Sequence, residues 1–328
     1  MIVCSGEALI DMVPAGDRPD AFVARPGGCP YNTAIAASRL GAPVAFLGRL
    51  GTDFLGTLLF DRLVANGVEV GLLARSPQAA TLAFVSRDRE GNARYAFYSE
   101  GAADRSFARE DLPARLPSET RFLMVGSISM VQEPVATTVE TLARREHERL
   151  LVSLDPNIRP SLIADREAYF ERFERWASLS ALVKVSADDI EWLYPGLSYE
   201  HAASRLMRLG ASLVVITLGL EGALAVTATT TARAAGHRVR VADTIGAGDT
   251  FHAALLAELD AEGVATRSEL ASMDADRLRA LLRFANAAAA LNCTKTGAEP
   301  PTRKETLRLL RGGGLVESRT GGAGSHGA

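Results

Sequence analysis

Residues 243–251 read DTIGAGDTF, a glycine-rich turn that runs directly into a helical pattern. Gly246, Ala247 and Gly248 carry little or no side chain, so a ligand can approach their backbone N–H groups closely. The first amides of a helix have no intrahelical acceptor, and the helix dipole is positive at that end. The stretch therefore predicts a loop and helix start that bind phosphate or another anion.

Asp249 falls in the first turn of this helix, beside the predicted anion-binding loop. A carboxylate in that place can take a proton from an alcohol while the loop stabilises a transferring phosphoryl group. A plainer role has the same pattern, because an acidic residue in the first helical turn interacts favourably with the dipole. The spacing alone leaves both roles open.

Along most of the chain, short apolar runs rich in β-branched residues alternate with longer helical patterns. Such alternation builds a mostly parallel sheet with helices on both faces. We therefore expect an α/β, doubly wound fold with strands at 2–5, 44–48, 122–125, 151–154, 181–185, 213–217, 223–226 and 238–241. Helices are expected at 31–40, 54–65, 134–149, 166–178, 199–209, 248–262, 276–291 and 302–310.

Two segments break the alternation, because they are extended and have no helix between them. They lie at about 9–25 and 80–100, and the second contains a turn, 88–92, between two β-rich runs. We interpret them as a small antiparallel β-strand lid on an α/β domain that spans residues 1–311, although two surface hairpins without function would look the same. The Gly/Ser-rich tail, 312–328, is predicted to be flexible.

A second cluster of small residues lies near the N-terminus, where residues 27–32 read GGCPYN and a helical pattern follows. Gly27 and Gly28 again open the backbone to a ligand, and the side chain of Asn32 offers a hydroxyl group both a donor and an acceptor. Asp11, after the first predicted strand, is a further acceptor. A simple turn followed by a helix cap would leave the same pattern.

Charge and composition exclude several other classes of protein. The 328 residues carry 36 Lys+Arg against 39 Asp+Glu, so no basic field is available for nucleic acid or for an anionic membrane surface. The longest uncharged stretch, 26–38, is too short to span a bilayer. Three cysteines without CxxC spacing, and a start without a secretory signal, indicate the cytoplasm. The scattered histidines predict no zinc or iron site.

Together the two clusters resemble the signatures of the PfkB (ribokinase-like) carbohydrate kinase family. The glycine pair and Asn32 are followed by Gly41 and Gly51 at the intervals of the N-terminal signature, and residues 243–256 match the C-terminal signature. The resemblance covers residues 1 to about 311. Four further stretches, GEALIDMVP, GRLGTDFLG, FYSEGAADR and DPNIRP, are most similar to the bacterial fructokinases of this family.

The resemblance implies a ribokinase-like fold and transfer of the γ-phosphoryl group of Mg-ATP to a sugar hydroxyl. Asp249 would then be the general base, and the backbone of Gly246, Ala247 and Gly248 would be the anion hole. The residues implied for sugar binding are Asp11, Gly27, Gly28, Asn32, Tyr98 and Arg159. Those implied for ATP binding are Lys184, Ser186, Thr217, Gly219, Gly222, Gly248 and Asn286.

The resemblance also implies metal ions. Mg²⁺ would be held mainly by the nucleotide and water, since this ion keeps several of its waters. The family's N-x-x-E motif, which is linked to magnesium, departs here to the residues 186–189, SADD, in which Asp189 keeps the carboxylate on a shorter side chain. For a monovalent cation such as K⁺, the matching positions are Asp243, Ile245, Asn292 and Gly297.

The residues of the predicted lid indicate which sugar is phosphorylated. Relatives that phosphorylate 2-keto-3-deoxygluconate carry Tyr-x-Arg there, and the arginine pairs with the carboxylate. Here Tyr98 is followed by Ser99 and Glu100, which favours a neutral hexose, with fructose first. Arg94 or Arg105 could replace the missing arginine, so a 2-keto-3-deoxygluconate kinase stays open. A nucleoside or aminoimidazole riboside kinase also stays open, because aromatic lid residues can stack on a base.

Two alternatives come from other classes. A non-catalytic sugar or nucleotide sensor would share the fold, but the intact Asp249 and anion hole favour a kinase. A dinucleotide-dependent oxidoreductase is disfavoured, because the G-x-G-x-x-G pattern at 322–327 has no strand before it and no helix after it. His252 is expected to be a packing or surface residue. The expected partners are ATP and a small sugar, without nucleic acid or membrane, and pairing of lid edges would give a homodimer.

Overall fold

The structure is a computed structural model that describes residues 1–16, 20–87 and 93–312. The predicted turn at 88–92, and the tail after its first residue, lie outside the described residues.

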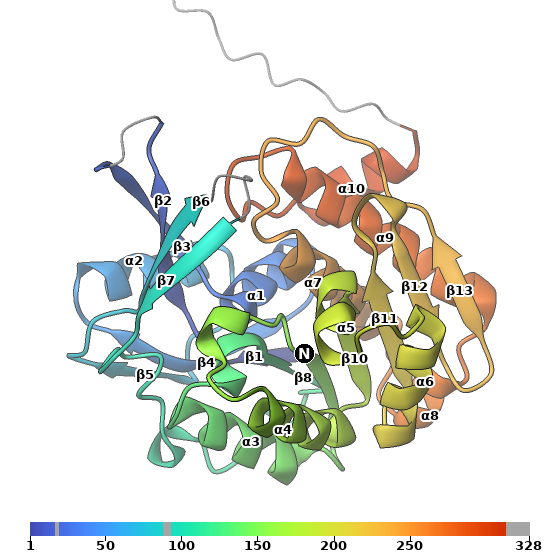
Figure 1. The fold of residues 1–328 in the computed structure, drawn as a ribbon, viewed down its shortest axis with the longest axis horizontal. Coiled ribbons are helices and arrows are strands. Elements are labelled where there is room, and N and C mark those ends of the chain that lie inside the picture. Colours follow the sequence, from blue (N-terminus) through green and yellow to red (C-terminus); the bar gives the residue numbers. More distant parts are fainter. Residues whose placement is uncertain (17–19, 88–92, 313–328) are drawn as a thin grey trace, which may run out of the picture.

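A nine-stranded sheet forms the centre of the described chain, in the order β13-β12-β11-β10-β9-β8-β1-β4-β5 (Figure 1). Pairing is parallel from β11 to β5, and antiparallel from β11 through β12 to β13. The strands are β1 (Ile2–Ser5), β4 (Val44–Gly51), β5 (Leu73–Ser76), β8 (Phe122–Gly126), β9 (Leu151–Asp155), β10 (Leu182–Ser186), β11 (Leu213–Thr217), β12 (Ala223–Val226) and β13 (Thr231–Ala234). The carboxyl ends of the parallel strands meet at one edge, where sheets of this type bind ligands.

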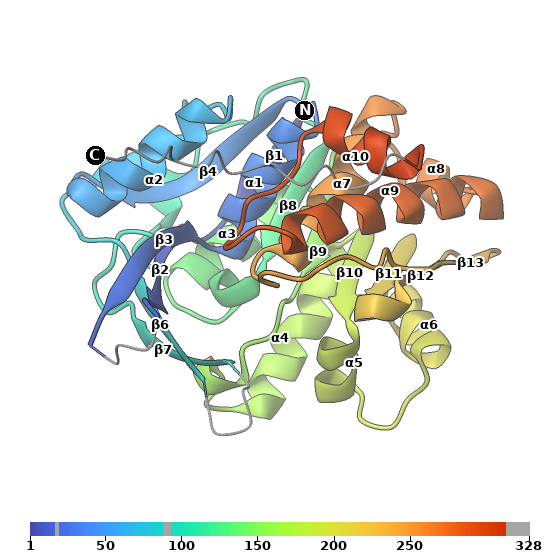
Figure 2. The same cartoon turned by 90° about the horizontal axis from the view of Figure 1, so that it is seen from above.

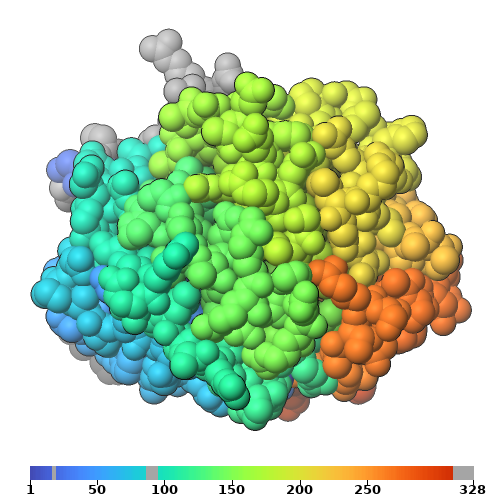
Figure 3. Space-filling model, turned by 90° about the horizontal axis from the view of Figure 1, so that it is seen from below, coloured from blue at the N-terminus to red at the C-terminus, as the bar shows by residue number. Residues whose placement is uncertain are grey.

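Helices cover both faces of this sheet, and its central strands are mostly apolar and almost wholly buried. In β8, Phe122 and Met124 pack on one face, whereas Leu123 and Val125 pack on the other. The first face carries α1 (Cys29–Arg39), α2 (Phe54–Ala65), α7 (Ala247–Ala261) and α9 (Ala275–Cys293). The second carries α3 (Val135–Glu146), α4 (Arg166–Leu179), α5 (Ala187–Leu193) and α6 (Tyr199–Leu209). The view from above separates the two layers (Figure 2), and green segments that include α3 and α4 cover the sheet from below (Figure 3). The predicted doubly wound fold is confirmed.

Four more strands form a separate small sheet beside the carboxyl edge, in the order β3-β2-β6-β7. They are β2 (Leu9–Pro14), β3 (Phe22–Gly27), β6 (Leu82–Arg87) and β7 (Ala93–Tyr98). The predicted second sheet is therefore present, but it is not wholly antiparallel, because its middle pair β2–β6 is parallel. Each of these two strands is the first strand of its hairpin, so the two hairpins lie side by side with their first strands paired.

Some element predictions were wrong. Residues 238–241 form no strand; they run as an irregular segment, and β13 takes the sheet edge instead. The alternation of exposed and buried residues in β13 shows that only one of its faces packs on the core. Three short elements were not predicted: β5, α5 and α8 (Arg267–Ala271). They have 4, 7 and 5 residues and are too short to show a clear period.

The C-terminal helix α10 (Arg303–Leu310) packs against α9. None of the helices in the described part of the chain combines the length and the apolar composition that crossing a bilayer requires.

Candidate active site

The site is built around the start of α7. Gly246 caps this helix in the left-handed conformation, at φ 75°, and a Cβ there would lie 3.0 Å from the Cα of Ala298. Only glycine therefore fits this turn without strain. Asp249 lies in the first turn of α7, as the sequence predicts.

Two cavities meet at this turn. The first, of about 240 Å³, lies between the small sheet and the main body, and we call it the lid cavity. The second, of about 300 Å³, lies against α9, and we call it the α9 cavity. Thr244 and Gly248 line both cavities, so the N-terminus of α7 separates two compartments that a pair of ligands could occupy at once.

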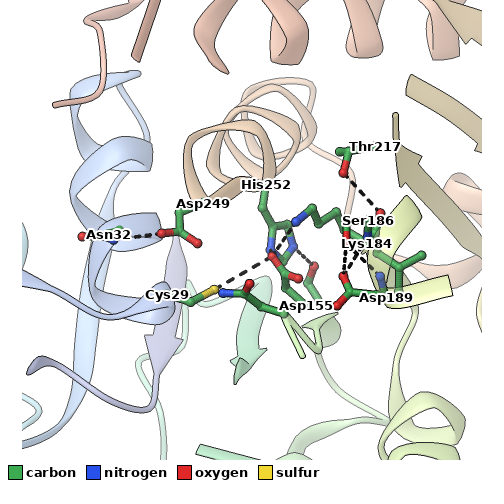
Figure 4. A network of polar contacts seen from close by, with 12 residues as sticks. Cys29, Asn32, Asp155, Lys184, Ser186, Asp189, Thr217, Asp249 and His252 are labelled. Carbon is green, nitrogen blue, oxygen red and sulfur yellow. Dashed lines mark hydrogen bonds and ion pairs between the residues drawn. The ribbon is translucent and has the colours of Figure 1, made fainter. Parts of the chain in front are cut away.

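Asp249 is buried in the wall of the lid cavity (Figure 4). The side-chain amide of Asn32, on α1, donates to Asp249 Oδ2 over 2.8 Å. Burial raises the pKa of the Asp249 carboxyl group, and the charge of Asp155 raises it further, whereas the hydrogen bond from Asn32 opposes the shift. A carboxylate with a raised pKa is a stronger proton acceptor, and Asn32 fixes its orientation.

Gly27 packs closely against the side chain of Asp11, and Gly28 packs against the backbone of Glu7. A Cβ on Gly27 would lie 2.1 Å from Asp11 Oδ2, and one on Gly28 would lie 2.7 Å from the carbonyl oxygen of Glu7. Both positions therefore need glycine, and Gly28 also has a φ of 109°. Asp11 and Gly28 line the lid cavity. Burial and the nearby charge of Asp249 raise the pKa of Asp11 to about 7, against the pull of Arg159.

Arg159 reaches the lid cavity from the loop after β9. Its guanidinium donates to Asn157 Oδ1 over 2.7 Å and lies 5.6 Å from the ring centroid of Tyr95, on β7. Asn157 also lines the cavity and adopts a φ of 38°. Arg159 thus connects the main body to the inner face of the lid.

The expectation for Tyr98 is corrected by the geometry. Its side chain is 66% exposed and packs against Phe84, with ring centroids 5.5 Å apart, and it does not line the lid cavity. Side chains alternate along β7, so Tyr95 and Phe97 face the cavity instead.

Glu7 is a cavity residue that the sequence analysis missed. It is fully buried, it lines the lid cavity, and its carboxylate accepts hydrogen bonds from the Cys29 backbone and from Ser129. Burial raises the pKa of Glu7 to about 7, although these hydrogen bonds oppose the shift. The available signal was its place directly after the buried strand β1, at the ligand-binding edge of the sheet.

Four of the residues predicted for ATP binding come together around the α9 cavity with Gly248: Thr217, Gly219, Gly222 and Asn286. The Asn286 amide donates to the carbonyl oxygens of Ala234 and Ala235, both over 3.1 Å, and so holds the chain after β13. The other walls are mostly apolar, including Phe251 and Ala289. Such a slot suits a flat, largely apolar ring.

Lys184 and Ser186 line neither cavity. Lys184 is buried, and its Nζ donates to Asp155 Oδ2 over 2.8 Å (Figure 4). It nevertheless lies close to the start of α7, because a Cβ on Gly248 would be 3.2 Å from Lys184 Nζ. Ser186 is the N-cap of α5.

The magnesium-linked role expected for Asp189 does not match its geometry. Its Oδ1 accepts from the Ile158 amide over 2.8 Å, and its Oδ2 accepts from the amide and hydroxyl of Ser186 over 2.8 and 2.7 Å. Asp189 lines neither cavity. It completes a capping box, which satisfies the free amides at the start of α5.

The four residues predicted for a monovalent cation do come together. Asp243 accepts from the amides of Ile245 and Gly297 over 3.1 and 2.9 Å, and the Asn292 amide donates to the Ile245 carbonyl over 2.8 Å. Asn292 Oδ1 is buried and has no hydrogen-bond partner. This oxygen is free to accept a hydrogen bond or to bind a cation, beside the loop that leads into α7.

Comparisons with known proteins agree with this geometry. The profile of the pfkB family carbohydrate kinases matches residues 1–305. A fructokinase of Rhizobium leguminosarum bv. trifolii is 41% identical over 285 residues, which cover 85% of this chain and 86% of that protein. The crystal structure of a Xylella fastidiosa fructokinase with bound ATP has a TM-score of 0.87, with 32% identity over 95% of this chain and 98% of that chain. A Vibrio cholerae fructokinase with fructose, ADP and calcium ion bound has a TM-score of 0.77, with 27% identity over 90% of this chain and 94% of that chain. The chain described above belongs to the pfkB family of carbohydrate kinases.

Proposed function

We propose that this chain is a fructokinase, which transfers the γ-phosphoryl group of Mg-ATP to a hydroxyl group of fructose. The observation that carries the proposal is the meeting of a polar and a mostly apolar cavity at Asp249 and the start of α7. The 41% sequence identity with the Rhizobium fructokinase supports fructose as the sugar.

The sugar occupies the lid cavity, where Asp11, Asn32 and Arg159 offer donors and acceptors to its hydroxyl groups. Asp249 takes the proton of the reacting hydroxyl, whose oxygen bonds to the γ-phosphorus as the bond to ADP breaks. The positive end of α7 stabilises the charge on the transferring group. The nucleotide base occupies the α9 cavity, against Asn286.

Mg²⁺ enters as part of the substrate, coordinated by the phosphates and water, since the oxygens of Asp189 already accept three hydrogen bonds from the protein. A monovalent cation fits beside Asp243, because the unpartnered Asn292 Oδ1 supplies the oxygen ligand that such an ion prefers. Its positive charge would lie next to the anion-binding loop.

The charges around the lid cavity favour a neutral sugar. Its acidic lining residues are Glu7, Asp11 and Asp249, and Arg159 is the single basic side chain among the described lining residues. Arg105 is held elsewhere, because it donates to the carbonyl of Glu133 and does not line the cavity. The side chain of Arg94 lies outside the described residues. A sugar acid would therefore find only Arg159 as a basic partner among the described lining residues.

We place the enzyme in the cytoplasm, because its cysteines, Cys4, Cys29 and Cys293, are all unpaired, as is usual in a reducing compartment.

We also propose a homodimer through the lid. The outer strands β3 and β7 expose Phe22, Val23 and Tyr98, and an edge strand can pair with its copy. Light scattering of the purified protein gives the mass, and a monomer at micromolar concentration would contradict the dimer.

The substrate assignment is tested by ADP release from Mg-ATP with fructose, 2-keto-3-deoxygluconate, ribose, tagatose, adenosine and aminoimidazole riboside. We expect the highest kcat/KM with fructose. A preference for the keto acid would keep the kinase but overturn the charge argument. No ADP release with any of these acceptors, while ATP still binds, would support a sensor instead.

A further inference from the structure

A buried carboxylate, Asp155, lies beneath the catalytic turn and has no part in the proposed reaction (Figure 4). It is the last residue of β9 and is 0% exposed. Asp155 Oδ2 accepts the hydrogen bond from Lys184 Nζ, whereas Oδ1 has no partner. Asp155 lines neither cavity, so it cannot touch the sugar or the nucleotide base.

The thiol of Cys29 connects Asp155 to the proposed base. Cys29 Sγ lies 3.9 Å from Asp155 Oδ2, and one side-chain atom of each of Cys29, Asp155 and Asp249 lies within 4.8 Å of the other two. Burial and the neighbouring charges of Asp249 and Asp155 raise the pKa of the Cys29 thiol well above its usual value. The thiol therefore keeps its proton at neutral pH and can donate this single proton to either Asp155 or Asp249, which it lies between.

We propose that Asp155 is a positioning residue for the phosphoryl transfer, which acts through Cys29 to orient the carboxylate of Asp249 and strengthens that carboxylate as a base. The inference rests on the proposed function, because it requires Asp249 to accept the proton of the sugar. The hydroxyl proton of the sugar goes to Asp249, and Asp155 keeps its ion pair with Lys184.

Asp155 and Asp249 are both buried, and an oxygen of each lies within 4.8 Å of the other. Two buried carboxylates this close repel each other, so a proton on Asp249 relieves the repulsion. The other polar and charged groups around the two carboxylates come from several elements. They are Cys29 and Asn32 on α1, Lys184 on β10, His252 on α7, and Glu7, Asp11 and Arg159 at the lid cavity. His252 stays neutral, because burial and the charge of Lys184 lower its pKa well below the usual value.

Lys184 forms an ion pair with Asp155, the second carboxylate, over 2.8 Å. Burial lowers the pKa of Lys184, but Asp155 and Asp189 more than reverse this effect and raise it to about 12. A buried ion pair of this kind adds little stability compared with apolar residues of the same volume. The pair also leaves Asp155 Oδ1 and His252 Nδ1 without partners. The arrangement is better explained by its effect on Asp249 than by packing.

The test is the rate of phosphoryl transfer in a single turnover, measured against pH with saturating fructose and Mg-ATP, so that sugar binding does not contribute. The acid limb of the pH–rate profile is the range in which the rate falls as Asp249 becomes protonated. In Asp155→Asn this limb should move to lower pH by roughly one unit, because the negative charge that repels Asp249 is gone. The plateau rate should fall about tenfold, because a weaker base transfers the proton less readily. In Lys184→Met, the acid limb should move to higher pH.

Two sets of controls distinguish an effect on the pKa of Asp249 from a general loss of folding stability. Asp260→Asn removes another buried carboxylate of α7, which pairs with Arg121 over 2.8 Å and lines neither cavity, so it should lower stability without moving the limb. Cys29→Ala should move the limb to higher pH, and Cys29→Ser, which keeps a donor, should restore it. A limb that stays in place in Asp155→Asn, or that moves in the same direction in both charge variants, would overturn the inference.

The same measurement distinguishes this inference from the function on which it rests. If Asp249→Asn keeps the acid limb in its residual rate, the assignment of the base itself is wrong. If Asp249→Asn loses the limb and Asp155→Asn leaves it in place, only the role of Asp155 is wrong.

Discussion

The side-chain amide of Asn32 donates to Asp249 Oδ2 over 2.8 Å and joins two helices at residues 217 positions apart in the chain. This bond holds one carboxylate oxygen in place in a residue that lines the lid cavity. It also favours the ionised form, so it lowers the pKa of Asp249 against the effect of burial. Asn32 therefore controls both the orientation and the strength of the proposed base.

Asn32→Ala should lower kcat/KM for fructose about ten- to a hundredfold, the effect of losing a hydrogen bond to a charged group. The acid limb of the pH–rate profile should move to higher pH, since the group that lowers the pKa of Asp249 is lost. Steady-state rates between pH 5 and 9 measure both effects. Thr33→Val is a matched control, because Thr33 is buried on the same helix and its hydroxyl has no partner. An equal loss in that variant would show that the helix, and not the bond, was disturbed.

Asp249→Asn keeps the shape of the side chain and removes its ability to accept a proton. We expect kcat to fall by about 10²–10⁴, the usual contribution of general base catalysis. The dissociation constant of ATP should change little, because Asp249 does not line the α9 cavity. Quenched-flow assays and calorimetric titration with ATP measure the two quantities. Full activity in the variant would disprove the role of Asp249.

The parts of the site that could be predicted from the sequence are those fixed by backbone requirements. Gly27, Gly28 and Gly246 are glycines because a Cβ would collide there or because φ is positive, and such constraints leave a readable pattern. The start of α7 and the alternation of strands and helices have equally local causes. This explains why the fold was predicted correctly and why the glycines of both clusters could be singled out from the sequence.

The errors concern properties that depend on register and tertiary contacts. Tyr98 was expected in the cavity, but one step along β7 turns a side chain to the opposite face, and the sequence does not state the register. Asp189 and Lys184 lie in and beside the expected stretch 186–189, but their polar side chains are bound to other parts of the chain. Asp189 accepts from Ile158 in the loop after β9, and Lys184 donates to Asp155 at the end of β9. Glu7 was missed because an acidic residue after a strand is equally common in exposed turns.

Gly27→Ala should weaken sugar binding, because the new Cβ would lie 2.1 Å from Asp11 Oδ2 and must displace that carboxylate. We expect KM for fructose to rise about tenfold or more, the effect of losing one hydrogen bond to a charged group, with a smaller change in KM for ATP. Steady-state kinetics with each substrate varied in turn give both values. Gly71→Ala is the control, because Gly71 is exposed and a Cβ added there would meet no atom within 4 Å. Equal effects of the two substitutions would contradict the contact with Asp11.

Asp104 forms hydrogen bonds with Thr81, the residue before the lid strand β6. Its carboxyl group should make the free energy of unfolding depend on pH. Its Oδ1 accepts from the Thr81 hydroxyl over 2.7 Å, whereas its buried Oδ2 has no partner. Burial raises the pKa of Asp104 to about 6, although the bonds from Thr81 oppose the shift. The folded state therefore holds this proton more tightly than the unfolded state does. Stability from this group is complete below the unfolded pKa and is lost as pH rises toward about 6.

Asp104→Asn removes this loss, because the amide keeps the acceptor for Thr81 and does not ionise. Relative to the wild type, the variant should gain about 1.5 kcal/mol in the free energy of unfolding between pH 5 and pH 7.5, as expected from a shift of about two pKa units. Urea unfolding at the two pH values measures the difference. Glu148→Gln, at an exposed position of the described chain, should leave the pH dependence of the wild type unchanged. If Asp104→Asn has the same pH dependence as that control, the carboxyl group of Asp104 ionises as readily in the folded protein as in the unfolded chain.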